Sequence, residues 1–148
     1  MTTSSVFSRN GEEVQAIQRP IVLAIDDDED NLLLIRFTLE LYGCEFLGDA
    51  SGEAMLSLAR EHQPDLILLD ILLPTLNGFD LIKLLKQDLL TCDIPVVAVT
   101  GLAGEDDRRQ LLQAGFVGYM IKPYLPEDLE SIVRQYSRCP LAANLSVD

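Results

Sequence analysis

Short runs of consecutive apolar residues constrain the fold of this chain more than any other feature. Four runs are clear: Ile21–Ile25, Leu66–Leu69, Ile94–Val99 and Tyr119–Ile121. A fifth, Cys44–Leu47, is weaker. The runs are rich in Ile, Val and Leu and are apolar at successive positions, which is typical of strands covered on both faces in a parallel sheet. The sequence therefore predicts buried strands at these places.

Between the runs, apolar residues recur at steps of three and four, which is one face of a helix. The five patterns are carried by Leu32, Ile35, Leu39 and Tyr42; by Met55 and Leu58; by Leu81, Leu84 and Leu85; by Leu111 and Leu112; and by Leu125, Leu129, Ile132 and Tyr136. Ser51 predicts an N-cap, Gly43 and Gly115 predict C-terminal caps, and Pro126 suits a first helical turn. Strand and helix thus alternate five times along the chain.

This alternation predicts a doubly wound α/β fold, because right-handed crossovers place helices on both faces of a parallel sheet. We expect a five-stranded parallel sheet of the flavodoxin-like (βα)5 type over residues 20–137. Residues 1–19 are expected to form a polar N-terminal tail, and residues 138–148 a C-terminal tail.

Composition excludes several classes of function. The net charge of −13 disfavours binding to nucleic acid or to an anionic membrane surface. No apolar run is long enough to cross a bilayer, and residues 1–20 lack the apolar segment of a secretory signal. Cys44, Cys92 and Cys139 form no close pair, and His62 is the only histidine, so we expect reduced thiols, no zinc site and a cytoplasmic location.

Polar residues follow the predicted strands where each strand ends. Asp26 and Asp27 follow the first strand, Asp70 the third, Thr100 the fourth and Lys122 the fifth. Ligands of open α/β sheets bind at the carboxyl ends of the strands, so we expect these side chains to meet at one edge. Each residue alone would more often be a cap or a solvated surface residue; the signal is the ordered set.

Three neighbouring carboxylates repel one another and require a counter-charge. A hard divalent cation such as Mg²⁺ prefers carboxylate and phosphate oxygens, and Mg²⁺ with one lysine would neutralise three acids. A carboxylate can also attack phosphorus, while the metal, lysine and hydroxyl hold the oxygens of the transferred group. The cluster therefore predicts Mg²⁺-dependent phosphoryl transfer to a carboxylate.

The same residues resemble the motifs of response-regulator receiver domains. The matching segments are Ile21–Asn31, Pro64–Asp70 followed by Pro74 and Gly78, Val96–Thr100, and Lys122-Pro123. The spacings between Asp70, Thr100 and Lys122 are similar to those of the chemotaxis response regulator. The resemblance extends over about residues 20–136.

This resemblance implies a role for each site residue. Asp70 would accept the phosphoryl group, and Asp70, Asp27 and the backbone carbonyl of Leu72 would bind Mg²⁺. Asp26 would bind the metal directly or through water. Lys122 would contact the phosphoryl group.

The resemblance also implies a conformational switch. The Lys122-Pro123 peptide would be cis. Thr100 would be the switch hydroxyl and Tyr119 the switch aromatic, so that phosphorylation reshapes the face of the fourth helix, fifth strand and fifth helix. Leu72 and Leu102, which would flank the phosphoacceptor, are apolar and cannot hydrogen-bond an attacking water. We therefore expect slow self-dephosphorylation.

As a stand-alone receiver, the protein would be a phosphoacceptor rather than a turnover enzyme. It would take its phosphoryl group from a sensor histidine kinase or a histidine phosphotransfer protein and pass the signal to a downstream protein, and it could form a homodimer. Two alternatives remain. Asp26–Asp28 also fits the Asp-x-Asp motif of haloacid-dehalogenase-like phosphatases, and a receiver can act by contact alone, independently of phosphorylation.

Overall fold

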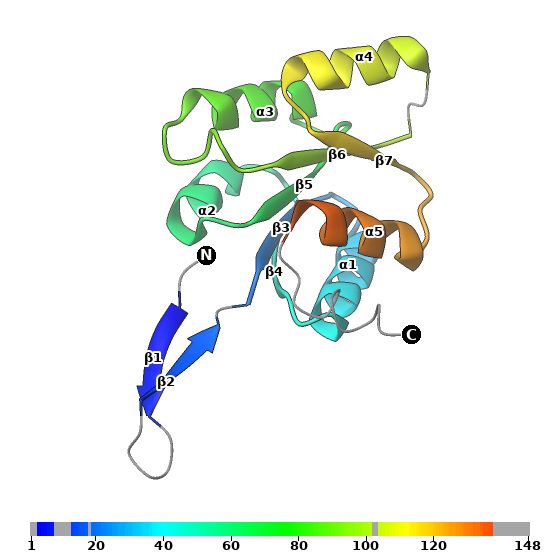
Figure 1. The fold of residues 1–148 in the computed structure, drawn as a ribbon. Coiled ribbons are helices and arrows are strands. Elements are labelled where there is room, and N and C mark those ends of the chain that lie inside the picture. Colours follow the sequence, from blue (N-terminus) through cyan, green and yellow to red (C-terminus); the bar gives the residue numbers. More distant parts are fainter. Residues whose placement is uncertain (1–2, 8–12, 18, 102–103, 138–148) are drawn as a thin grey trace.

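The computed structural model describes residues 3–7, 13–17, 19–101 and 104–137, and its centre is one five-stranded sheet (Figure 1). The strands of this sheet are β3 (Ile21–Ile25), β4 (Glu45–Asp49), β5 (Leu66–Asp70), β6 (Val96–Thr100) and β7 (Gly118–Ile121). They are parallel and lie in the order β4-β3-β5-β6-β7. The predicted parallel sheet is confirmed, and the weak fifth run forms its edge strand β4.

Helices cover both faces of this sheet, as predicted (Figure 1). They are α1 (Glu29–Leu41), α2 (Met55–His62), α3 (Gly78–Gln87), α4 (Glu105–Ala114) and α5 (Pro126–Tyr136). Apolar residues of α1 and α5 pack against one face of the sheet. Those of α2, α3 and α4 pack against the other. Because the strand residues are apolar on both faces of the sheet, each face is buried under its helices. We call the edge of the sheet where the carboxyl ends of the strands lie the carboxyl rim.

Most predicted helix ends are confirmed. Gly115 is the C-cap of α4 with φ +111°, and Gly43 follows the end of α1 with φ +78°, a left-handed conformation that glycine adopts without steric cost. Pro126 occupies the first turn of α5. The side chain of Leu125 cannot cap α5, but the Asp128 carboxylate accepts a hydrogen bond from the Leu125 N–H at 2.9 Å.

The predicted cap at Ser51 is wrong. Helix α2 begins at Met55 and its N-cap is Ala54, which has no capping side chain. Ser51 Oγ instead accepts the N–H of Glu53 at 3.1 Å. The carboxylate of Asp49, at the end of β4, accepts the N–H of Ala54 at 2.8 Å. The acid that ends the strand therefore organises the turn into the helix.

The N-terminal segment contains two strands that the sequence did not predict. β1 (Thr3–Phe7) and β2 (Glu13–Ile17) pair antiparallel in a separate two-stranded sheet. The sequence predicts only a polar tail at residues 1–19. Strand pairing uses main-chain groups that every residue except proline carries, so a polar composition does not exclude it. The predicted tail at 138–148, including Cys139, lies outside the described residues.

Among the described residues, none of the helices combines the length and apolar character that a bilayer crossing requires. Cys44 and Cys92, the two cysteines that the structure describes, are not joined by a disulfide bond.

Candidate functional site

The polar side chains that follow the strands converge at the carboxyl rim of the sheet. Asp26 and Asp27 follow β3, and Asp70 is the last residue of β5. One carboxylate oxygen from each of these three acids lies within 4.8 Å of the other two. Because neighbouring parallel strands end at the same edge, residues distant in sequence form one cluster. The predicted convergence of these acids is confirmed.

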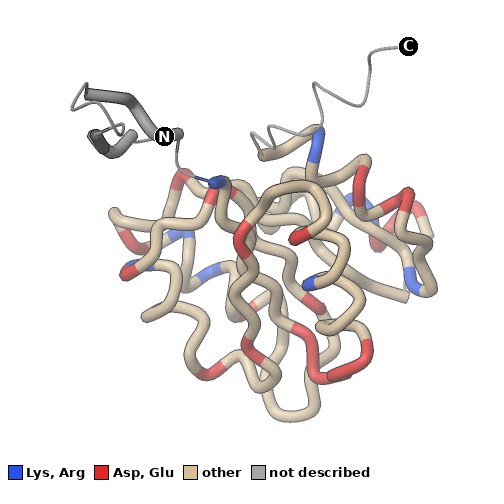
Figure 2. The backbone as a smooth tube through the Cα atoms, turned by 90° about the horizontal axis from the view of Figure 1, so that it is seen from below, with Lys and Arg blue, Asp and Glu red and all other residues tan. Residues whose placement is uncertain are grey.

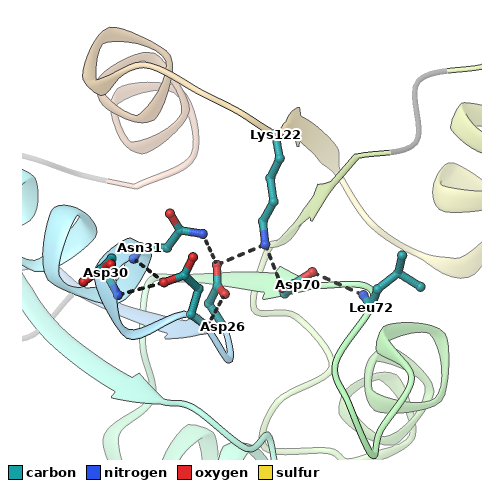
Figure 3. Close-up of polar contacts among 7 residues, drawn as sticks. Asp26, Asp30, Asn31, Asp70, Leu72 and Lys122 are labelled. Atoms are coloured by element: carbon teal, nitrogen blue, oxygen red, sulfur yellow. Dashed lines mark hydrogen bonds and ion pairs between the residues drawn. The ribbon is translucent and has the colours of Figure 1, made fainter.

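Lys122 lies between two of these acids (Figure 3). Its Nζ is 2.8 Å from Asp70 Oδ2 and 3.4 Å from Asp26 Oδ2. Partial burial lowers the pKa of Lys122, but its hydrogen bond to Asp70 and the charges of both acids outweigh this, so the net shift is upward. The lysine is therefore a charged ammonium group that is held against both carboxylates.

Asp26 is fixed by its own strand–helix turn. Its Oδ1 accepts the N–H of Asp28 at 2.9 Å, and its Oδ2 accepts from Asn31 Nδ2 at 3.3 Å. Burial raises the pKa of the Asp26 carboxyl, and the nearby charge of Asp70 raises it further, against the lowering effects of the Asp28 N–H and Lys122. Sequence reasoning assigned no role to Asn31. The contact could have been predicted from the position of Asn31, which lies five residues after Asp26 in the first turn of the next helix.

Asp70 is 3% exposed, yet its carboxylate faces the rim. Oδ1 accepts the N–H of Leu72 at 3.2 Å, while Oδ2 binds Lys122 (Figure 3). The side chain of Leu72 is 64% exposed and points away from the cluster. The Lys122–Pro123 peptide bond is cis, the geometry that the resemblance implies.

The donor set fits a hard divalent cation. The longest unbroken acidic stretch of the chain, Asp26–Asp30, lies at this rim (Figure 2). Lys122 pairs with two of the three clustered carboxylates, Asp26 and Asp70, so the cluster has an excess of negative charge. Carboxylate oxygens are the ligands that Mg²⁺ prefers, whereas the cluster offers no thiolate or imidazole for softer metals.

Thr100 and Tyr119 lie on the same face of adjacent strands. Tyr119 pairs in register with Ala98, two residues before Thr100. Thr100 is 2% exposed, whereas the ring of Tyr119 is half-buried. A void of about 20 Å³ lies beside Thr100 and is lined in part by Asp107 and Leu111 of α4. Such a void has room for about one water molecule, and not for an aromatic ring.

A cation covers the ring of Tyr119. The guanidinium carbon of Arg108, on α4, lies 5.4 Å from the ring centroid. This distance is within the range of a cation–π interaction. Sequence reasoning missed Arg108, because a contact between a helix and the neighbouring strand depends on tertiary packing.

Tyr124 is a third residue, after Asn31 and Arg108, to which sequence reasoning assigned no role. Its hydroxyl is buried and has no hydrogen-bond partner among the described residues. Burial raises its pKa far above the ordinary value, and the charges of Asp26, Asp28 and Asp70 add to this shift. Tyr124 therefore carries a neutral hydroxyl beside the acidic cluster. Leu102, predicted to flank the phosphoacceptor, lies outside the described residues.

Comparison with known proteins gives a consistent result over most of the chain. A family model described as the response regulator receiver domain matches residues 22–134. The polar-differentiation response regulator DivK of Brucella ovis is 42% identical over 112 residues, which cover 75% of this chain and 91% of that protein. DivK of Brucella anthropi is 41% identical over the same length.

Solved structures agree with the fold. The chemotaxis response regulator CheY4 of Vibrio cholerae has a TM-score of 0.76 at 24% identity, with 80% of this chain and 99% of that chain covered. The receiver domain of sensor histidine kinase PA1611 from Pseudomonas aeruginosa has a TM-score of 0.72 at 27% identity, with 80% and 98% covered. That structure is described with a magnesium ion coordinated in the active-site cleft.

Proposed function

Because the chain belongs to the response regulator receiver domain family, we propose that it is a phosphoacceptor of a two-component system that takes a phosphoryl group on Asp70. One observation carries this proposal. The carboxylate of Asp70 meets those of Asp26 and Asp27 and is held at 2.8 Å by the ammonium group of Lys122. This set supplies a nucleophile and its charge partners in one place.

In the proposed reaction, a carboxylate oxygen of Asp70 attacks the phosphorus of the donor. A new O–P bond forms, and the bond to the donor's leaving atom breaks with its electron pair remaining on the donor. Lys122 then moves from the carboxylate to a phosphoryl oxygen, and the hydroxyl of Thr100 donates to another. Mg²⁺, held by Asp26, Asp27, Asp70 and the carbonyl of Leu72, would supply positive charge to the transferred group.

The proposed output is a change of the output face, which we define as α4, β7 and α5. Response regulator receiver domains are signalling proteins rather than turnover enzymes. A cytoplasmic sensor histidine kinase or phosphotransfer protein would donate the phosphoryl group, and a downstream protein would bind the changed face. Movement of Thr100 toward the phosphoryl group would open space for the ring of Tyr119. This would shift an existing equilibrium between outward and inward positions of the ring toward the inward one.

Incubation with Mg²⁺ and acetyl phosphate, followed by mass spectrometry of the labelled peptides, tests this function. Label on Asp70 supports a receiver, whereas label on Asp26 would indicate the haloacid-dehalogenase-like alternative. A receiver that acts by contact alone would bind its partner equally well as wild type and as Asp70→Asn.

Arg108→Gln should favour the phosphorylated conformation. The substitution removes the cation that holds the half-buried ring of Tyr119, and a cation–π contact at an exposed site contributes about 0.5–1 kcal/mol. We therefore expect binding of beryllofluoride, a stable mimic of the phosphoryl group, to tighten about two- to fivefold in a calorimetric titration. Arg109→Gln is the matched control, because Arg109 pairs with exposed Asp106 on the same helix. Equal affinities in the two variants would show that the ring contact has no such role.

Leu72→Asn should shorten the lifetime of the phosphorylated protein. Leu72 is exposed beside Asp70 and cannot orient a water for attack, whereas an amide can. A side chain that transfers a proton accelerates a reaction by about 10²–10⁴-fold. An amide that only orients the water should have a smaller effect, and we expect dephosphorylation to be roughly tenfold faster. The decay of label after removal of the donor measures the effect, with Leu72→Met as the apolar control. A lifetime unchanged by Leu72→Asn would contradict this explanation of slow dephosphorylation.

A further inference from the structure

Among the side chains that the structure describes, only the hydroxyl of Tyr124 is buried without a hydrogen-bond partner. Nearly all buried polar groups in proteins have a partner, which is either a protein group or an ordered water. Burial and the charges of nearby acids raise the pKa of this hydroxyl far above its ordinary value, so it keeps its proton. The hydroxyl is therefore a donor that requires an acceptor outside the described protein groups.

Tyr124 lies at the carboxyl rim of the sheet. It follows β7 and stands two residues after Lys122, whose ammonium group contacts Asp26 and Asp70. The ring of Tyr124 packs with the core cluster on the face of the sheet that α1 and α5 cover. The charges of Asp26, Asp28 and Asp70 all act on its hydroxyl. The buried hydroxyl is thus next to the acidic cluster, while its ring is anchored in the core.

The acids closest to this hydroxyl are bound by other donors. Asp26 accepts from a backbone N–H, from Asn31 and from Lys122. Asp28 accepts from two backbone N–H groups in the first turn of α1. None of these carboxylates hydrogen-bonds the hydroxyl of Tyr124 directly. A water molecule between the hydroxyl and the acids is the partner that fits, because such a water would have several polar groups to bind.

The proposed protein ligands would leave part of the coordination of Mg²⁺ to water. Mg²⁺ requires a nearly octahedral set of oxygens and usually keeps several waters. Three carboxylates and the carbonyl of Leu72 do not complete an octahedron. A water on the cation is polarised and donates strongly, and a tyrosine hydroxyl can accept a hydrogen bond as well as donate one. The hydroxyl could therefore bind a water of the cluster both with and without the cation.

We propose that Tyr124 is a positioning residue for the metal, and that its hydroxyl hydrogen-bonds a water that Mg²⁺ retains in the acidic cluster. This proposal rests on the proposed function, since it concerns the same cluster. Hydrogen bonds to groups around a metal orient those groups, and their loss lowers the affinity for the metal. The role belongs to the hydroxyl alone, because the ring packs in the core in either case.

Tyr124→Phe tests the proposal, because it removes only the hydroxyl. Thermal unfolding over a range of Mg²⁺ concentrations gives the affinity of each variant. Without Mg²⁺, Tyr124→Phe should melt at the temperature of wild type or above it, since no hydrogen bond to a described protein group is lost. Mg²⁺ should then stabilise the variant less, with an affinity about two- to tenfold weaker than that of wild type, which is the range for one hydrogen bond.

Tyr136→Phe is the matched control. Tyr136 packs in the same core cluster as Tyr124, but its hydroxyl donates to the carbonyl of Val117 at 3.1 Å. Val117 directly precedes β7, so this contact lies at the end of the strand opposite the carboxyl rim. Tyr136→Phe should melt below wild type both with and without Mg²⁺, and its Mg²⁺ affinity should equal that of wild type. This control separates an effect on the metal from the general effect of removing a tyrosine hydroxyl.

Tyrosine fluorescence gives a second measurement that does not depend on unfolding. The chain has four tyrosines and no tryptophan, so its intrinsic emission comes from tyrosine. Saturating Mg²⁺ should change the emission of wild type and of Tyr136→Phe, because the hydrogen bonding of the Tyr124 hydroxyl changes. The larger part of this change should be absent in Tyr124→Phe.

The possible failures are distinguishable. A wild type that Mg²⁺ does not stabilise would refute the metal site of the proposed function and this proposal with it. If wild type binds Mg²⁺ and Tyr124→Phe binds it equally well, the role of Tyr124 alone is refuted. A melting temperature of Tyr124→Phe that lies below wild type by the same amount with and without Mg²⁺ would also refute it, since the hydroxyl would then bind a structural water that is independent of the metal.

Discussion

Replacing Asp70 by Asn should abolish labelling of the protein by acetyl phosphate. The amide is neutral and cannot attack phosphorus, and the remaining carboxylates have other partners: Asp26 is held by Asp28 and Asn31. Wild type with Mg²⁺ should gain the mass of one phosphoryl group, and Asp70→Asn should not. We expect the rate of labelling to fall by at least about 10²-fold, which is typical of the loss of a catalytic group. Intact-protein mass spectrometry measures both.

The control for this experiment is Asp80→Asn, which makes the same chemical change at an exposed position in the first turn of α3. Asp80→Asn should be labelled like wild type. Undiminished labelling of Asp70→Asn would refute the assignment, and the position of the remaining label would identify the true nucleophile. The unlabelled variant should remain folded, since removing one of three crowded carboxylates also removes repulsion between them.

Removing Mg²⁺ should have the second largest effect. We expect a chelator to stop labelling of wild type, and we expect Mg²⁺ to raise the free energy of unfolding, by about 2.7 kcal/mol at a hundredfold excess over the dissociation constant. Asp27→Asn should lower the Mg²⁺ affinity by roughly tenfold or more, because it replaces one of the three carboxylate ligands with a neutral amide. The same Mg²⁺ concentration should then stabilise this variant less than wild type. Thermal unfolding at several Mg²⁺ concentrations measures the affinity.

Asp30→Asn serves as the comparison for Asp27→Asn. Asp30 is exposed in the first turn of α1, and its carboxylate is not among the three that converge. If Mg²⁺ raised the melting temperature of Asp27→Asn as much as that of wild type and of Asp30→Asn, the three carboxylates would not be the metal site.

The rim was predictable from sequence because it follows from local rules. Apolar runs identify the strands, and parallel pairing brings the carboxyl ends of the strands to one edge. The contacts of Lys122 with Asp26 and Asp70 could therefore be predicted without knowing how the helices pack. The turn after β4 was not predictable in the same way. Ser51 fits the usual preference for an N-cap, but the carboxylate of Asp49 binds the backbone of that turn instead.

Contacts between a helix and the sheet could not be predicted from the periodicity of the sequence. The pairing of Arg108 with the ring of Tyr119 depends on how α4 lies against β7. The spacing of apolar residues in α1 correctly predicted the face that packs on the core, which carries Ile35 and Leu39, but it did not show that Phe37 stays exposed. The pairing of β1 with β2 was not predicted, although polar and apolar residues alternate over residues 13–16, because residues 1–19 were interpreted as a polar tail.

The strand order β4-β3-β5-β6-β7 divides the molecule about Asp70, which ends the central strand. Thr100 and Lys122, the two side chains that would follow the phosphoryl group, both belong to the β6–β7 side, together with Tyr119 and Arg108. Strands β3 and β4 lie on the other side, and helix α1 packs against them and against α5. The half of the sheet formed by β6 and β7 would thus respond to the phosphoryl group, whereas the half formed by β3 and β4 would keep one structure in both states.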